Sequence, residues 1–418
     1  MRPFNWISKL GPGLITGAAD DDPSGIATYS QVGAQFGFAM LWVMLFSFPL
    51  MVAAQLISAR IGRVTGRGIA HNLAKSYPRW LVVTVVVLLF AANTINIAAD
   101  IGAMGEALTL LIGGQAHLYT LCFGLVCVLM QIFMPYPRYV PFLKWLTLAL
   151  FAYVAVAFMV QVPWTTVLYR TFIPAVSWDA KYFVALTAVL GTTISPYLFF
   201  WQASHEAEEQ RAATGDRPLR RAPRQARRQL TDSGTDTYVG MAFSNLIAYF
   251  IILSAAVTLH AHGVTDIETT AQAAEALRPI AGDLTFWLFA AGIIGTGLLG
   301  VPVLAGSAAY GIGEAFHWRV GLAHQFNRAR GFYLILALAT LLGTLLNLTP
   351  IDPIKALFWS AVINGVLAAP VLGLIVWMAA QHRVMGRFIV RGRLKKIGWI
   401  ATAIMLIATL AFFWNLKK

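Results

Sequence analysis

The chain has 418 residues, of which 58% are hydrophobic and only 12% are charged. The mean hydropathy is +0.68, and the charged share is about half that of a soluble domain. This composition excludes a disordered chain, a fibrous repeat and an ordinary soluble enzyme. The formal charge of +13 does not indicate nucleic-acid binding, because the basic residues separate long apolar runs and do not form one polar surface. The sequence therefore predicts a polytopic membrane protein.

Because a bilayer core needs about 20 apolar residues per helix, the apolar runs predict about eleven transmembrane helices. They are expected at about 10–33, 38–60, 80–111, 116–134, 142–162, 182–202, 237–260, 283–308, 329–348, 354–380 and 395–415. The region 266–279, between the seventh and eighth runs, has an apolar-periodic pattern that favours a short helix outside the membrane. The predicted fold class is an all-α integral membrane protein.

The positions of Lys and Arg predict the orientation of the chain. A cytoplasmic N-terminus places 25 of the 31 Lys and Arg residues on the inner side. With eleven spans the C-terminus is then outside, in the cytoplasmic (inner) membrane. The densest basic segment, Arg217–Arg228, is interpreted as a solvated loop that touches anionic lipid, with nucleic-acid binding or regulation as less favoured alternatives. The expected partners are the lipid bilayer and a substrate, and not nucleic acid.

Two of the predicted helices contain residues that interrupt a helix near the middle of the membrane. The first run holds Asp20, Asp21 and Asp22 directly before Pro23, and the sixth run holds Pro196 after several polar residues. Proline removes a backbone donor and disfavours helix at the preceding residue. Irregular backbone at this depth is tolerated only where it lines a cavity or is buried in protein. We therefore expect helices 1 and 6 to be broken at mid-membrane.

The two breaks also predict an internal repeat. Each broken helix opens a set of five spans, and an odd number of spans forces the two sets into opposite orientations. We expect a single transporter domain over 1–418, with repeat 1 at about 10–162, repeat 2 at about 182–380 and an additional helix at about 395–415. The binding site is expected where the breaks meet. Two proline kinks without a site are the less favoured alternative.

The residues at both breaks resemble motifs of the NRAMP family of divalent metal-ion transporters. Asp22–Thr28 (DPSGIAT) fits the frame of the family's first-helix motif, and Gly191–Tyr197 (GTTISPY) fits that of the sixth helix. Ala99-Asp100 matches an Ala–Asp pair of the third helix. The resemblance extends over most of the chain. It implies an inverted-repeat (5+5) fold of the LeuT type, a metal site at the breaks and a transporter without enzymatic activity.

Five positions depart from the family pattern. The metal-binding Asn of the family falls at Gly25, its thioether Met at Ser195, the His beside the sixth-helix Pro at Tyr197, a second His at Gln202 and the Glu of the third helix at Ala103. This pattern resembles the branch called NRAMP-related magnesium transporters. A thioether selects softer metals, whereas oxygen ligands suit Mg²⁺ and Mn²⁺. The smaller residues at Gly25 and Ser195 also predict a wider site.

The predicted metal site is centred on Asp22 as the charged ligand, with Gly25, Thr192 and Ser195 around it and backbone carbonyls freed by the second break. Accessory candidates are Asp20, Asp21, Ser24, Tyr197, Asp100, Glu106, Gln202 and Asn364. Mg²⁺ sheds water reluctantly and is usually held through one or two carboxylates, which such a site offers. The metal ion is the expected substrate, and no resident cofactor is expected.

Several candidates have two readings. Asp100 and Glu106 are interpreted as structural groups or as a proton route, and Asn364 as a partner in a helix–helix hydrogen bond or as a ligand. The acidic cluster after the sixth span, at Glu206, Glu208 and Glu209 with the neighbouring His205, is either an exit vestibule for cations or a solvated helix end.

The function expected from these residues is uptake of Mg²⁺, with Mn²⁺ also accepted. Ala103, Tyr197 and Gln202 do not titrate near neutral pH, so we expect transport that is driven by the membrane potential and not coupled to protons. The alternative is a proton-coupled Mn²⁺/Fe²⁺ transporter of the NRAMP type. A sodium-coupled amino-acid symporter on the same fold is a different class, which three Asp residues at the break disfavour. A membrane enzyme is disfavoured because no HExxH or phosphate-loop pattern is present.

Overall fold

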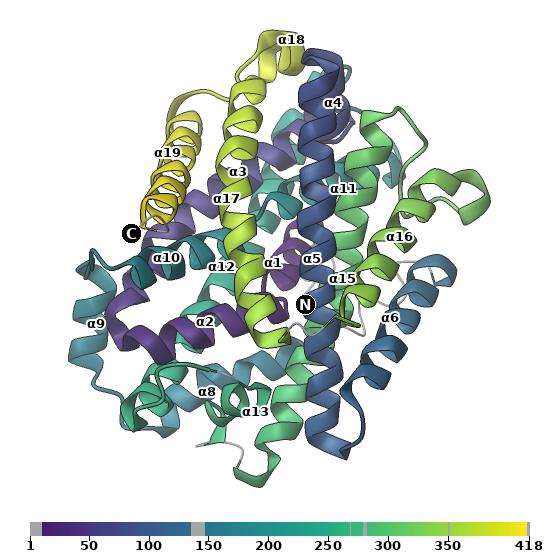
Figure 1. The fold of residues 1–418 in the computed structure, drawn as a ribbon. Coiled ribbons are helices and arrows are strands. Elements are labelled where there is room, and N and C mark those ends of the chain that lie inside the picture. The colour runs from purple at the N-terminus through teal and green to yellow at the C-terminus, as the bar shows by residue number, and fades with distance from the viewer. Residues whose placement is uncertain (1–10, 135–146, 268, 279–281, 350–351, 416–418) are drawn as a thin grey trace, which may run out of the picture.

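The computed structural model of the chain describes residues 11–134, 147–267, 269–278, 282–349 and 352–415. Every regular element in these ranges is a helix, which confirms the predicted fold class there. Helix α5 runs through the height of the bundle and packs against α6, α15, α16 and α17 (Figure 1). Short helices α4 and α18 lie at one end of the bundle, and α8, α9 and α13 lie toward the other.

The α-helices of the described residues fall into a longer and a shorter group. The longer ones are α1 (Pro12–Asp20), α2 (Pro23–Phe36), α3 (Leu41–Thr65), α5 (Arg79–Ile112), α6 (Ala116–Phe133), α10 (Ala180–Thr193), α11 (Pro196–Ala212), α12 (Ala226–Thr258), α15 (Thr285–Ala315), α16 (Arg330–Leu346), α17 (Pro353–Ala379) and α19 (Gly392–Asn415). The shorter ones are α4 (Ile69–Ser76), α8 (Phe151–Met159), α9 (Trp164–Phe172), α13 (Thr270–Glu275) and α18 (His382–Met385). Helix α13 confirms the short helix expected within 266–279.

Each predicted span overlaps a helix in the described residues. In this part of the chain, eight helical segments are long and apolar enough to cross a membrane, judged by length and composition. Two shorter apolar helices, Leu148–Met159 and Arg330–Leu346, coincide with the fifth and ninth predicted spans. The start of the fifth span, at 142–146, lies outside the described residues. The chain is an integral membrane protein, and the number of its crossings stays a prediction.

Both predicted helix breaks are confirmed. Helix α1 ends at Asp20 and α2 begins at Pro23, while α10 ends at Thr193 and α11 begins at Pro196. Each second half starts with a proline, whose missing N–H has no intrahelical partner at a first helical position and whose fixed φ suits the helix. Two residues without α-helical structure therefore separate the two helices at each break.

Close glycine contacts fix the broken helices against their neighbours. A Cβ atom at Gly17 of α1 would lie 2.2 Å from the carbonyl oxygen of Gly240 on α12. A Cβ atom at Gly191 of α10 would lie 2.0 Å from the carbonyl oxygen of Ala361 on α17. No side chain fits at either position, so the backbones of these helix pairs touch. The first break is thereby held against α12 and the second against α17.

Two helices are longer than the predicted spans. Helix α12 begins at Ala226 and not near residue 237, and α11 ends at Ala212 and not near residue 202. Polar residues end the part of a helix that suits the membrane, but they do not end the helix itself. These extensions bring charged side chains of α11 and α12 to the end of the molecule where α1 begins.

Candidate metal-ion site

Asp22 stands between the two halves of the first broken helix. Its side chain is only 2% exposed, and its backbone is extended. The Oδ1 atom accepts a hydrogen bond of 2.8 Å from the backbone N–H of Gly25, which caps the first turn of α2. An aspartate at this position satisfies a free N–H and places negative charge at the positive end of the helix. The cap leaves the second oxygen, Oδ2, directed toward α5 and α11.

An amide on α5 connects Asp22 to a second carboxylate. The side-chain NH2 of Asn96 donates to Oδ2 of Asp22 at 3.1 Å and to Oδ2 of Asp100 at 3.4 Å. Asn364 on α17 donates to Oδ1 of Asn96 at 3.5 Å. All four side chains are buried. Two carboxylates and two amides from three helices therefore meet beside the first break.

Tyr197 reaches the same place from the second broken helix. Its hydroxyl lies 3.0 Å from the carbonyl oxygen of Ala19 and 3.3 Å from Oδ2 of Asp22, and its single hydrogen serves one of them at a time. Ala19 is in the last turn of α1, whose final carbonyls lack intrahelical partners. The tyrosine therefore joins the start of α11 to the end of α1.

Gly25, Thr192 and Ser195 lie at the two breaks but point in different directions. The Ser195 hydroxyl contacts the carbonyl oxygens of Gly191 and Thr192, so it turns back onto the end of α10. A Cβ atom at Gly25 would lie 3.0 Å from the carbonyl oxygen of Asp20 and 3.3 Å from Oγ1 of Thr192. A side chain at Gly25 would therefore press on neighbouring atoms, while the wider site expected from the sequence stays a prediction.

Ser24 and a glycine of α15 complete the surroundings of Asp22. The Ser24 hydroxyl lies 3.1 Å from the carbonyl oxygen of Leu357 and 3.1 Å from the hydroxyl of Ser360, both on α17. A Cβ atom at Gly300 would lie 3.1 Å from Cβ of Asp22. A larger residue at this point of α15 would crowd the carboxylate, so the glycine leaves room where the polar groups converge.

Four of the predicted accessory residues lie elsewhere. Asp20 and Asp21 turn toward α12, where both contact the hydroxyl of Ser244. Glu106 accepts a hydrogen bond from Thr270 at the start of α13. Gln202 donates to Glu206 and accepts from Thr16 on α1. By contrast, Tyr197 contacts Asp22, and Asp100 and Asn364 are linked to it through Asn96. The Ser24 hydroxyl faces α17 instead, and the role of all four residues as ligands stays a prediction.

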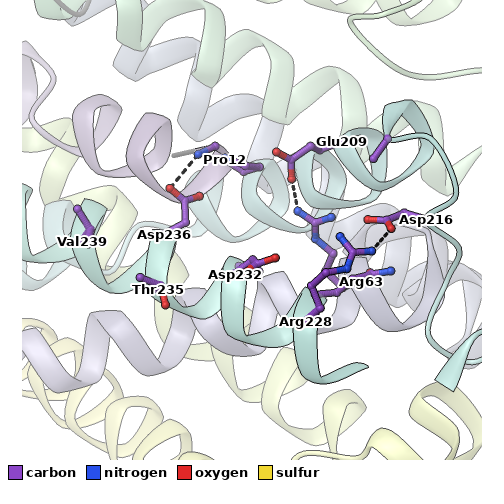
Figure 2. Close-up of a pocket in the computed structure, with 13 residues that line it drawn as sticks. Pro12, Arg63, Glu209, Asp216, Arg228, Asp232, Thr235, Asp236 and Val239 are labelled. Carbon is purple, nitrogen blue, oxygen red and sulfur yellow. Dashed lines mark hydrogen bonds and ion pairs between the residues drawn. The ribbon is translucent and has the colours of Figure 1, made fainter. Parts of the chain in front are cut away.

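A polar cavity of about 520 Å³ opens at the end of the molecule where α1 begins (Figure 2). Asp236 of α12 accepts hydrogen bonds from the backbone N–H groups of Gly11 and Gly13 at 2.9 and 2.6 Å, which fixes the start of α1. Arg63 of α3 forms ion pairs with Glu206 and Glu209. Glu206 is buried in its ion pair, whereas Glu209 is partly exposed and lines the cavity, so the exit vestibule stays a prediction.

A second cavity, of about 380 Å³, is lined by residues of α2, α10 and α17 and of the segment before α13. They include Gln31, Gln35, Lys181, Asp266 and Lys355. Asp22 is buried and lines neither cavity. Neither cavity therefore reaches the carboxylate of Asp22 in this structure.

The central site suits a hard cation with few direct protein ligands. Within the described ranges, no three or more His, Cys, Asp and Glu side chains lie close enough to hold a metal ion together. The groups near Asp22 are two carboxylates, two amides and the hydroxyl of Tyr197. The Asn96 amide directs its nitrogen to both carboxylates and its oxygen to Asn364. Oxygen ligands suit Mg²⁺ and Mn²⁺, and Mg²⁺ keeps several waters when few carboxylates bind it.

Two site residues were not among the predicted ligands. Asn96 lies one turn before Asp100 on α5, and a polar side chain in so apolar a helix is the signal that could have identified it. Gly300 lies in a stretch of α15 that also contains Gly292, Gly295 and Gly297, and none of these glycines was predicted to belong to the site. Which glycine faces Asp22 depends on how α15 is rotated, and the sequence does not contain that information.

The described residues thus form a helical membrane protein in which two broken helices meet at a buried polar site. A manganese transporter of Eremococcus coleocola, solved in complex with an aromatic bis-isothiourea substituted compound, has the same fold. The TM-score is 0.72 at 18% identity, with 97% of this chain and 86% of that one covered. MhsT in complex with L-phenylalanine gives a TM-score of 0.61 at 13% identity, with 97% of both chains covered. The predicted LeuT-type fold is confirmed.

The sequence matches the family described as natural resistance-associated macrophage protein-like (Nramp) over residues 13–415, and the chain belongs to this family. The divalent metal cation transporter MntH of Acidiphilium cryptum is 26% identical over 415 residues, which is 96% of this chain and 89% of that protein. MntH of Verminephrobacter eiseniae is 26% identical over 385 residues, with 90% and 82% covered. The chain is a membrane transporter and not an enzyme.

Proposed function

We propose that the protein transports divalent metal cations, with Mg²⁺ preferred and Mn²⁺ also accepted, through the site at Asp22. The observation that carries this proposal is the arrangement in which Asp22, Asn96, Asp100 and Tyr197 meet as oxygen-bearing groups with no sulfur ligand. Asp22 would supply charge to the ion, and Ser195 and Thr192 would supply neutral oxygen atoms at the second break. The ion is the substrate, and we propose no resident cofactor.

The replacement of the family's methionine by Ser195 supports a hard-metal preference. A thioether favours softer transition metals, and a hydroxyl does not. A site with two carboxylates, of which only Asp22 stands at the helix break, also suits an ion that keeps much of its water. Both properties favour Mg²⁺ over the softer metals.

We further propose that transport is driven by the membrane potential and not by protons. At the positions where family members carry titratable groups, this chain has Ala103, Tyr197 and Gln202, and Gln202 is bound to Thr16 and Glu206. A negative potential inside favours entry of a divalent cation by about 4.6 kcal/mol per 100 mV, which is twice the value for one charge. We also propose that the N-terminus is cytoplasmic and that the two five-helix repeats have opposite orientations.

A proton-coupled manganese transporter is the second candidate. It is favoured by the names of the relatives, which are divalent metal cation and manganese transporters. Asp100 is the residue that would favour it here, because one of its oxygens has no hydrogen-bond partner. A sodium-coupled amino-acid symporter rests on the fold alone, and the carboxylates at the first break disfavour an anionic substrate.

Uptake into proteoliposomes tests the proposal. Vesicles with an internal Mg²⁺ indicator and an internal pH dye receive external Mg²⁺ under an inside-negative potassium diffusion potential. We expect potential-dependent Mg²⁺ entry without acidification of the lumen. Acidification that accompanies Mg²⁺ or Mn²⁺ entry would show proton coupling, and Mn²⁺ entry without Mg²⁺ entry would favour the second candidate.

A further inference from the structure

Asp20 and Asp21 are two buried carboxylates that the central site does not use. Both residues are 0% exposed. The hydroxyl of Ser244 lies 2.6 Å from Oδ2 of Asp20 and 3.3 Å from Oδ1 of Asp21. One hydroxyl has one hydrogen, so it donates to one of these oxygens at a time. The other oxygens, Oδ1 of Asp20 and Oδ2 of Asp21, have no hydrogen-bond partner.

No basic side chain in the described residues compensates this pair. The ion pairs in that part of the chain involve Arg63, Arg228 and Arg278, and none of them reaches Asp20 or Asp21. A buried charge is costly unless it is paired or coordinates a metal. The two adjacent carboxylates, each with one oxygen that has no hydrogen-bond partner, are therefore not neutralised by any basic side chain of the described residues.

The pair is distinct from the site at Asp22. Asp22 uses its two oxygens for Gly25, on α2, and for Asn96 and Tyr197, on α5 and α11. Asp20 and Asp21 face α12 instead. The loss of helical geometry after α1 is what allows three consecutive carboxylates to divide between two sides of the break.

The position of Ser244 is fixed by the contact between α1 and α12. Asp236 holds the backbone N–H groups at the start of α1, and Gly17 touches the backbone of Gly240 four residues further along α12. One further turn of α12 brings Ser244 level with the end of α1. Asp236, Gly240 and Ser244 are each four residues apart, so they lie on one face of α12, and this face packs along α1.

We propose that Asp20, Asp21 and Ser244 form a second site, which binds a hard metal cation beside the transport site. The protein ligands are all oxygen atoms, and two of these residues carry carboxylates, which suits an alkali or alkaline-earth ion. A bound ion joins the first break to α12 and stabilises the arrangement in which they meet. The site does not depend on which ion is transported at Asp22.

Cation-dependent thermal stability of the full-length protein in detergent tests this site. The Asp22→Asn variant removes the charge of the transport site, and its melting temperature is compared in choline, Na⁺, Mg²⁺ and Mn²⁺ at constant ionic strength. A ligand that binds only the folded state raises the melting temperature. We expect a rise of at least about 2 °C with one of the metal cations. A rise in Na⁺ identifies a sodium site, and a rise only in Mg²⁺ or Mn²⁺ identifies a second divalent ion.

Further variants on the Asp22→Asn background show whether Asp20, Asp21 and Ser244 cause the rise in melting temperature. Asp20→Asn and Asp21→Asn, made singly and together, should abolish it, and Ser244→Ala should reduce it. Ser254→Ala is the matched control, because Ser254 is also buried on α12 but donates to the backbone of Tyr153. The site is disproved if no cation stabilises Asp22→Asn, or if the shift persists in the double Asn variant. Normal Mg²⁺ uptake by Asp22→Asn would instead disprove the proposed transport site alone.

Discussion

The two helix breaks have the same backbone plan but different chemistry. At the first break, Asp22 caps α2 and keeps one oxygen directed into the protein. At the second break, Ser195 does not cap α11, and its hydroxyl returns to the carbonyls at the end of α10. The first break therefore supplies negative charge, and the second supplies neutral oxygen atoms together with Tyr197.

This difference indicates that the two breaks contribute different chemical groups to the proposed site. If the ion binds at Asp22 as proposed, residues of the first repeat balance its charge, while the second break provides backbone carbonyls and the uncharged Tyr197 hydroxyl. Substitutions at the first break should therefore change transport more than substitutions at the second. The predictions below are ordered by that expectation.

Asp22→Asn should have the largest effect. Asn is as good a helix N-cap as Asp, so the hydrogen bond to Gly25 and the fold are retained while the charge is lost. Loss of one partner of a buried charge interaction costs about 3–5 kcal/mol, so we expect Mg²⁺ uptake to fall by at least about 100-fold. Uptake into proteoliposomes measures the loss, and uptake within threefold of wild type would contradict it.

Asp100→Asn should have a smaller effect, because Asp100 reaches Asp22 only through Asn96. Groups that orient a metal ligand typically change affinity or activity by about 10–100-fold, and we expect a loss near the lower value, about 10-fold. The concentration dependence of Mg²⁺ uptake checks this. A loss equal to that of Asp22→Asn would show that Asp100 binds the ion directly.

Tyr197→Phe removes the hydroxyl that contacts Asp22 and Ala19 and leaves the ring in place. A hydrogen bond to a charged group is worth about 1.5–3 kcal/mol, but the tyrosine hydrogen is shared, so we expect a three- to tenfold reduction in Mg²⁺ uptake. Tyr153→Phe is the matched control and should transport normally, because Tyr153 is also buried but lies on α8, outside both breaks.

Ser195→Ala should have the smallest effect. The substitution removes a neutral oxygen and the contacts to the end of α10, so we expect uptake to fall about two- to threefold, with stability lower by about 1 kcal/mol. The ratio of Mg²⁺ to Mn²⁺ uptake should not change, because no sulfur is gained or lost. A loss as large as that of Asp22→Asn would place the main ligand at the second break and reverse the comparison.

The sequence predicted the breaks because their signals are local. Proline alone is insufficient, since Pro49, Pro302 and Pro370 lie inside continuous helices. At Pro23 and Pro196 the preceding residues are polar and offer the backbone other hydrogen bonds. A proline that follows such residues within an apolar run therefore predicted each helix break. The same pattern predicted that Asp22 stands between the two halves of the first broken helix.

The partners of the site could not be predicted, because they depend on helix rotation and long-range packing. Three consecutive aspartates look equivalent in the sequence, yet two of them share the Ser244 hydroxyl as donor and the third accepts from Asn96. The pairing of Glu206 with Arg63 joins residues far apart in the chain. Such contacts follow from which faces of α3, α5 and α12 turn inward.

Competition between Mg²⁺ and Mn²⁺ tests the central claim most directly. Mn²⁺ uptake into proteoliposomes is followed with an internal quenched dye while external Mg²⁺ is raised to a large excess. If an oxygen-only site at Asp22 carries hard divalent cations, excess Mg²⁺ suppresses Mn²⁺ uptake, and Mg²⁺ itself appears in the lumen. Mn²⁺ uptake that is unaffected by about a hundredfold excess of Mg²⁺ would contradict the account, because the site would then prefer Mn²⁺ over Mg²⁺ by at least about 3 kcal/mol in binding free energy.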